Sequence, residues 1–208
     1  MNTANLYLFC LMALLASPHA FSQNSKHSSK HSSPYEELEF KEAQTDIVVL
    51  RQVAETKIAD FSAILKRTLM SAIQQQGLEH AVAVCKDQAP KIAEKLSKDG
   101  WTIARTSLKT RNAYNAPDEW EQTQLIAFNT LMNAGEPPAT LNVSDLSQGR
   151  FRYMKAIPTG QVCLACHGSQ VDPALLQSIQ AYYPNDRAIG FTLKDLRGAF
   201  SLTKAIKK

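Results

Sequence analysis

The sequence predicts an α+β domain in which helices come first and strands follow. Apolar residues recur at three- and four-residue steps over residues 47–73, which is the pattern of a helix with one buried face. Four later segments, 101–108, 151–157, 191–193 and 199–202, are rich in residues that favour strands. Because helices and strands do not alternate strictly, we expect an antiparallel sheet with flanking helices.

The N-terminal helix is expected to be long and to end at Gly77. Its apolar face consists of Ile47, Leu50, Ala54, Ile58, Phe61, Leu65, Leu69 and Ile73. A second helical stretch follows over residues 78–85. Asp87 is expected to cap a third helix, with Pro90 in its first turn and Gly100 beyond its end.

Short elements separated by turn signals make up the rest of the chain. Residues 112–117 contain Asn and Pro and are expected to form a loop, and the next helix spans 118–134 and is closed by Gly135. A helix opened by Asp and Pro is expected over 172–182. The last two strands flank a predicted turn at 195–198.

The first residues predict export. Leu6–Ala16 is almost continuously apolar but is too short to span a bilayer stably. Ala20 and Ser22 fit the small-residue positions of a cleavage site before Gln23, so we expect residues 1–22 to be a signal peptide and the mature protein to be periplasmic, with no stable membrane span. The alternative is an uncleaved membrane anchor, because no Lys or Arg precedes the apolar run.

The remaining chain predicts a linker followed by one domain. From Gln23 to Pro34 the composition shifts to Ser, Lys and His, so residues 23–36 are expected to form a flexible linker. Residues 37–208 are long enough for one domain with its own core. The net charge of +4 is small and dispersed, which argues against a nucleic-acid partner. The long N-terminal helix can pack on its own domain or pair with a second copy as a homodimer.

The segment Cys163-Leu164-Ala165-Cys166-His167 has the spacing of a c-type haem attachment site. Each thiol can add across a haem vinyl group, and the adjacent imidazole then lies beneath the ring as an axial iron ligand. A structural zinc site would need a second pair of ligands, and a redox Cys-x-x-Cys pair would need a βαβ pattern that the sequence lacks. The motif therefore predicts one covalent haem c, held by Cys163, Cys166 and His167.

Several residues of the chain are candidates for the other axial position of the iron. These are His27, His31, His80, Cys85, Met132 and Met154. His80 and Cys85 are five positions apart, so on an ideal helix they point about 140° away from each other and only one can face the iron. Cys85 shares its face with the small apolar residues Ala81, Val82 and Ala89, whereas His80 is expected to be solvated. A buried, inert thiol is the plainer interpretation of Cys85, and the residues alone leave these alternatives open.

A resemblance to a known family bears on this choice. The segments that carry it are Val84-Cys85-Lys86, Ala89-Pro90, Gly100-Trp101, Arg105-Thr106-Ser107-Leu108-Lys109, Arg111-Asn112, Asn115-Ala116-Pro117, the haem motif with Gly168, Tyr183-Pro184-Asn185-Asp186 and Arg197-Gly198-Ala199-Phe200-Ser201. From about Glu79 onward, the chain resembles secreted or membrane-tethered single-haem proteins with a PAS-like fold. The resemblance implies a PAS-like antiparallel sheet and an iron held by His167 and Cys85.

Three activities are compatible with such a site. With His/Cys axial ligation, a redox- or gas-responsive module would have a low potential, and loss of the thiolate on reduction would open the iron to a small gas. An electron-transfer cytochrome c would instead keep both ligands and need a redox partner. An enzyme such as a peroxidase would need acid/base groups beside an open iron position, and no paired carboxylate or His supports one, so enzyme activity is not expected.

Overall fold

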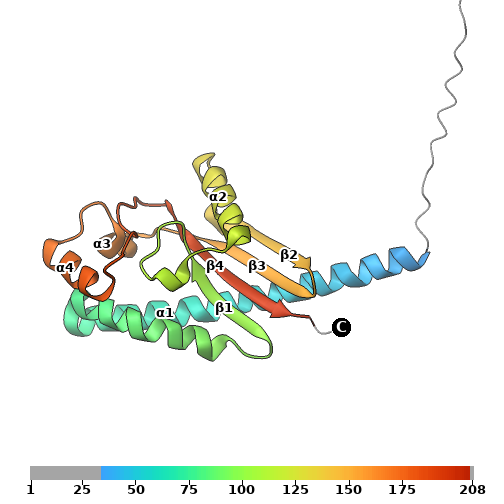
Figure 1. Ribbon diagram of the computed structural model, residues 1–208, viewed down its shortest axis with the longest axis horizontal. Helices are drawn as coiled ribbons and strands as arrows, with labels where there is room; N and C mark the ends of the chain where they lie inside the picture. Colours follow the sequence, from blue (N-terminus) through green and yellow to red (C-terminus); the bar gives the residue numbers. More distant parts are fainter. Residues whose placement is uncertain (1–33, 207–208) are drawn as a thin grey trace, which may run out of the picture.

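A four-stranded antiparallel sheet forms the middle layer of the domain (Figure 1). In the computed structural model, the backbone is described for residues 34–206 and the side chains for residues 46–206. The strands, in their order across the sheet, are β1 (Trp101–Thr106), β4 (Leu196–Ala205), β3 (Arg150–Pro158) and β2 (Asn142–Ser147). The last of these in the chain, β4, is an inner strand that pairs with both β1 and β3. The prediction of an α+β domain with an antiparallel sheet is confirmed.

A helical hairpin covers one face of the sheet. Helix α1 (Pro34–Leu96) contains one residue with non-helical angles, Gly77, at φ 82° and ψ −175°. Glycine reaches this positive φ without steric cost, and the chain reverses there. The segment 78–96 then runs back beside the earlier segment, so that Lys57 Nζ donates a hydrogen bond to Leu96 O at 3.1 Å (Figure 1). The predicted end of the long helix at Gly77 is confirmed.

The core between the hairpin and the sheet comes from the predicted apolar face of the helix. Its buried residues are Ala54, Ile58, Phe61, Ile92, Trp101, Ile103, Phe151, Tyr153 and Leu202. Phe61 meets Phe200 of β4 edge to face, with ring centroids 5.8 Å apart, and Trp101 meets Phe151 in the same way at 5.9 Å. These aromatic contacts add directional packing to the burial of apolar area.

The opposite face of the sheet is covered by α2 (Glu119–Asn133). Asp118 caps this helix, and its side chain and that of Glu121 form a reciprocal capping box. Side chains alternate along β3, so Tyr153 points to the hairpin while Met154 packs against Leu125 and Phe128 of α2. The helix predicted over 118–134 is confirmed.

Two shorter helices lie beyond one end of the sheet (Figure 1). Helix α3 (Leu164–His167) follows the 3₁₀ turn η3 (Gln161–Cys163), and α4 (Pro173–Tyr182) begins after the cap Asp172, as predicted. Further 3₁₀ turns, η1 (Ala113–Asn115) and η2 (Pro138–Thr140), lie in the connections on either side of α2. The returning segment of α1 packs against α4, which brings the middle of that segment beside the haem motif.

The third predicted helix, capped by Asp87, is wrong. Asp87 and Pro90 both lie inside the continuous helical segment that follows Gly77. Pro90 removes one backbone hydrogen bond, but Ala89 and Ile92 on either side of it are buried, and their packing holds the helix together.

The strand predictions are right for some segments and wrong for others. The structure confirms β3, and it confirms β1 up to Thr106, after which Ser107 Oγ bonds to Arg197 O at 2.8 Å and ends the strand. Strand β2 is not predicted, because its sequence lacks a clean alternation of apolar and polar residues. The strand predicted over 191–193 is wrong, since the Asp195 carboxylate accepts hydrogen bonds from the Thr192 backbone and hydroxyl in a tight turn.

The predicted signal peptide and most of the predicted linker lie outside the described residues. Helix α1 already begins at Pro34, within the segment expected to form the linker. Over residues 34–206, no helix combines the length and apolarity needed to cross a membrane.

Candidate haem site

The imidazole of His167 is oriented by a backbone carbonyl group. Its Nδ1 lies 2.6 Å from Ala188 O, and because a carbonyl oxygen can only accept, Nδ1 carries the proton and Nε2 is left as a free base. Burial, with the positive charges of Arg197 and Arg111, lowers the pKa of His167 to about 2. A neutral imidazole with one nitrogen fixed and the other free is the form that ligates metals.

The two thiols of the motif lie on one helical turn. Cys163 ends η3 and Cys166 lies in α3, three positions later, so both occupy the same side of the turn. Both are half-buried, and neither forms a disulfide. Burial raises the pKa of the Cys166 thiol, and Arg111 opposes that shift.

Gly168 lets the chain leave the motif. A Cβ atom at this position would lie 2.6 Å from Leu164 O, which is closer than real Cβ contacts, and Gly168 N donates to that same oxygen at 2.9 Å. The chain then runs beside the segment that carries Ala188, where Phe191 N donates to His167 O at 2.9 Å. The Phe191 ring meets the imidazole edge to face, with centroids 6.3 Å apart. Backbone and ring together fix the position of the motif.

Cys85 lies on the returning segment of α1, near enough to Cys166 and Arg111 for their charges to affect its pKa. Val82, one turn earlier, packs with Leu175 and Ile179 of α4 in a cluster that Cys166 also joins. The Cys85 thiol is half-buried and free. Burial raises its pKa, with smaller effects from the nearby Arg105, Cys166 and Arg111. The returning segment of α1 therefore lies beside the turn that carries Cys163, Cys166 and His167.

The other candidate ligands are less well placed. Met154 is fully buried on the α2 side of the sheet, and Met132 packs on the same cluster, away from Cys85. His80 is half-buried, so part of its ring remains in contact with solvent. His27 and His31 lie outside the described residues. Among the side chains of residues 46–206, no three His, Cys, Asp or Glu groups converge to hold a single ion.

A buried ion pair between Arg111 and Asp186 is hydrogen-bonded to the backbone of the motif. Arg111 Nη2 lies 3.1 Å from Asp186 Oδ2 and donates to Cys166 O at 2.6 Å. The other oxygen of Asp186 accepts from Ala188 N at 2.8 Å, so one carboxylate positions both the arginine and the carbonyl that orients His167. The Asp186 side chain is only 4% exposed. Both residues belong to segments that carry the family resemblance, but spacing alone assigned them no role.

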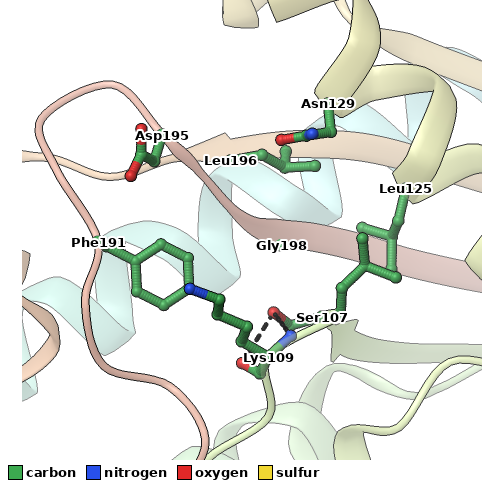
Figure 2. Close-up of a pocket in the computed structure, with 9 residues that line it drawn as sticks. Ser107, Lys109, Leu125, Asn129, Phe191, Asp195, Leu196 and Gly198 are labelled. Atoms are coloured by element: carbon green, nitrogen blue, oxygen red, sulfur yellow. Dashed lines mark hydrogen bonds between the residues drawn. The ribbon is translucent and has the colours of Figure 1, made fainter. Parts of the chain in front are cut away.

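A pocket of about 220 Å³ lies beside this site, between the loop after β1, α2 and the turn before β4 (Figure 2). Ser107, Lys109 and Phe191 line it together with residues of α2. Ser107 Oγ bonds to both the backbone nitrogen and the oxygen of Lys109, and the Lys109 ammonium lies 5.1 Å from the centre of the Phe191 ring. The pocket shares Phe191 with the motif but has no Cys or His in its wall.

Comparison with known proteins gives the family. The model of the Tll0287-like family matches residues 24–204. The chain belongs to the Tll0287-like family. Its fold is similar to that in the crystal structure of the cyanobacterial heme-protein Tll0287, at 24% identity and a TM-score of 0.55, covering 74% of this chain and 96% of that one. At this identity the similarity shows the Tll0287-like fold alone. No protein with a curated description matches the chain.

Proposed function

We propose that the protein is a periplasmic c-type haem protein with a PAS-like sheet. One haem is bound covalently through Cys163 and Cys166, and His167 and Cys85 are its axial ligands. The observation that carries this proposal is the hydrogen bond from His167 Nδ1 to Ala188 O, which leaves Nε2 free beside two free thiols. The fold similarity to a heme-protein of the same family supports it.

The donor set of the site fits this cofactor. A bound haem supplies an iron that cycles between ferric and ferrous states. His167 offers a neutral nitrogen, and the Cys85 sulfur offers a donor whose anionic form stabilises ferric iron. The three thiols and the imidazole do not converge on a point, as a single zinc ion would require, but spread over two facing elements, α1 and the motif turn.

We favour a redox- or gas-responsive role for this site. Burial raises the pKa of the free Cys85 thiol, so the sulfur would be held in its protonated form once it had left the iron. A protonated thiol is a weak iron ligand, so the position that it had vacated would be open to a small gas. The second candidate role is electron transfer to a redox partner, and the exposure of Gln161 and Val162 next to Cys163 favours it, because it brings that edge of the site to the surface.

Haem attachment is tested by purifying the full-length protein from cells with an active cytochrome c maturation system. We expect acid-acetone to leave the haem on the protein, and the mass to exceed that of the polypeptide by one haem, because thioethers are not broken by acid. Cys163→Ala and Cys166→Ala should each leave a single thioether or an unstable product. Ser201→Ala, which alters a buried residue on the α2 side, serves as a control and should keep the full haem content. A colourless, unmodified wild-type protein would show that the proposal is wrong.

Export gives a separate test of the proposed compartment. We expect the N-terminus of the mature protein to lie near Gln23 and the protein to be released with the periplasmic fraction, because the apolar run before it is too short for a stable span. N-terminal sequencing and fractionation measure this. An intact N-terminus that stays with the membranes would replace the signal peptide with an anchor.

A further inference from the structure

Two arginines beside the site lack the acidic partner that a buried arginine normally has. Among residues 46–206, the ion pairs involve Arg111, Arg152 and Lys155, and none involves Arg105 or Arg197. Arg111 is already committed to Asp186 and to the carbonyl of Cys166. Arg105 and Arg197 are half-buried, and a guanidinium group that is partly removed from water is costly unless it is paired, so these two favour the binding of an anion.

The contacts of the two side chains leave most of their donors free. The Arg105 guanidinium lies over the Phe61 ring, 5.6 Å from its centre, and makes no side-chain hydrogen bond within residues 46–206. The Arg197 guanidinium lies 5.2 Å from the centre of the Phe191 ring, and its Nη1 reaches Ser107 Oγ at 3.3 Å and Lys109 O at 3.5 Å. Aromatic faces and neutral oxygens hold these groups in place without neutralising them.

The pKa shifts of the two arginines also indicate that their positive charges are not compensated. Burial lowers the pKa of Arg197 to about 10, with the neighbouring Arg105 and Arg111 acting in the same direction. Burial also lowers the pKa of Arg105. Three positive groups close together, with one carboxylate among them, leave an excess of two positive charges.

Sheet register places the two arginines at the same end of neighbouring strands. Arg105 is opposite Phe200 in the pairing of β1 with β4, and Arg197 lies three positions before Phe200 on β4. Among the charged groups, Arg105 has the largest effect on the pKa of Cys85, and Arg197 has the largest effect on the pKa of His167. One unpaired cation therefore lies near each of the two proposed axial ligands.

We propose that Arg105 and Arg197 bind the two propionate carboxylates of the haem. This inference rests on the proposed function. Two free guanidinium groups match two carboxylates in charge, and the planar fork of arginine matches a carboxylate in geometry. Arg111 is a positioning residue, because it holds the motif backbone and is already paired with Asp186.

The test compares Arg105→Gln, Arg197→Gln and the double variant in the full-length holoprotein. Resonance Raman spectra should show a shift of the propionate bending modes in each single variant and a larger shift in the double one. The reduction potential should also become dependent on pH, because propionates released from arginine titrate at higher pH. Arg105→Lys and Arg197→Lys keep the positive charge but lose the forked geometry of the guanidinium group, so they should give intermediate shifts of the propionate modes. They also provide a second test if the Gln variants do not fold.

Arg152→Gln is the matched control. Arg152 is also a half-buried arginine over an aromatic ring, 4.2 Å from the centre of Trp120, but it is paired with Asp118 at 2.6 Å on the α2 side. It should leave the propionate modes unchanged. Unchanged modes in all the Arg105 and Arg197 variants would overturn the proposal, as would a change confined to the cysteine-to-iron charge-transfer band of Arg105→Gln. Failure of the proposed function is seen separately, as a wild-type protein without covalent haem.

Discussion

Cys85→Ala is expected to abolish the spectral signature of a thiolate bound to ferric low-spin iron. The wild-type protein should show a near-infrared charge-transfer band and electron paramagnetic resonance values distinct from those of His/Met and bis-His haems. Without the sulfur, the reduction potential should rise and the iron should bind water or added ligands, because an anionic donor that stabilises the ferric state is gone. Absorption and electron paramagnetic resonance spectra, recorded with and without carbon monoxide, measure the change.

His80→Ala is the matched control for this experiment. It lies on the same helix about one turn and a half before Cys85, so it disturbs the same segment without removing the sulfur. Its spectrum should stay that of the wild type. A spectrum converted by His80→Ala and preserved in Cys85→Ala would make the protein a bis-His cytochrome. If neither change mattered, a methionine ligand would be left, which the burial of Met154 on the α2 side does not support.

Gly198→Ala is expected to destabilise the domain more than other single methyl additions. Gly198 has φ 155°, and a Cβ there would collide with Thr106 O and lie 3.1 Å from Ser107 Cβ. Both obstacles belong to the chain at the end of β1, so the strands must separate where Arg105 and Arg197 enter the site. Such overpacking costs about 3 kcal/mol, which in a chain of this size lowers the melting temperature by about 6–12 °C.

Gly135→Ala separates the collision from the backbone strain. Gly135 also has a positive φ, 96°, but a Cβ atom added there would meet nothing within 4 Å. It should therefore lose only about 1 kcal/mol, the cost of the left-handed backbone for a residue with a side chain. Thermal unfolding followed by circular dichroism compares the two. Equal losses in both variants would contradict the close approach of β4 to the end of β1.

The parts of the fold that depend on local signals were predictable from the sequence. The apolar face over residues 47–73, the helix over 118–134 and its end at Gly135 depend on signals that act within a few residues, and all of them are found in the structure. The motif Cys163–His167 is equally local. The helix start predicted at Asp87 is wrong because the packing of the continuous helix around it outweighs the capping preference of Asp.

Features that depend on tertiary contacts were not predictable in the same way. Strand β2 is held by its pairing with β3 and not by its own pattern, and the segment 191–193 is diverted by Asp195 into a turn. The hydrogen bond from His167 to Ala188 joins two segments that are distant in the sequence, and no sequence spacing predicts it. Cys85 was assigned to the site from the family resemblance, because a single cysteine on a helix does not by itself indicate a ligand.

The order of the strands also sets an order of assembly. Strand β4 lies between β1 and β3, yet it is synthesised after both of them. Until β4 has been made and inserted, β1 and β3 have no common neighbour, and the central pairings of the sheet cannot form. The Cys163–His167 segment therefore precedes, along the chain, the strand that closes the sheet, and Arg197 and Gly198 belong to that closing strand.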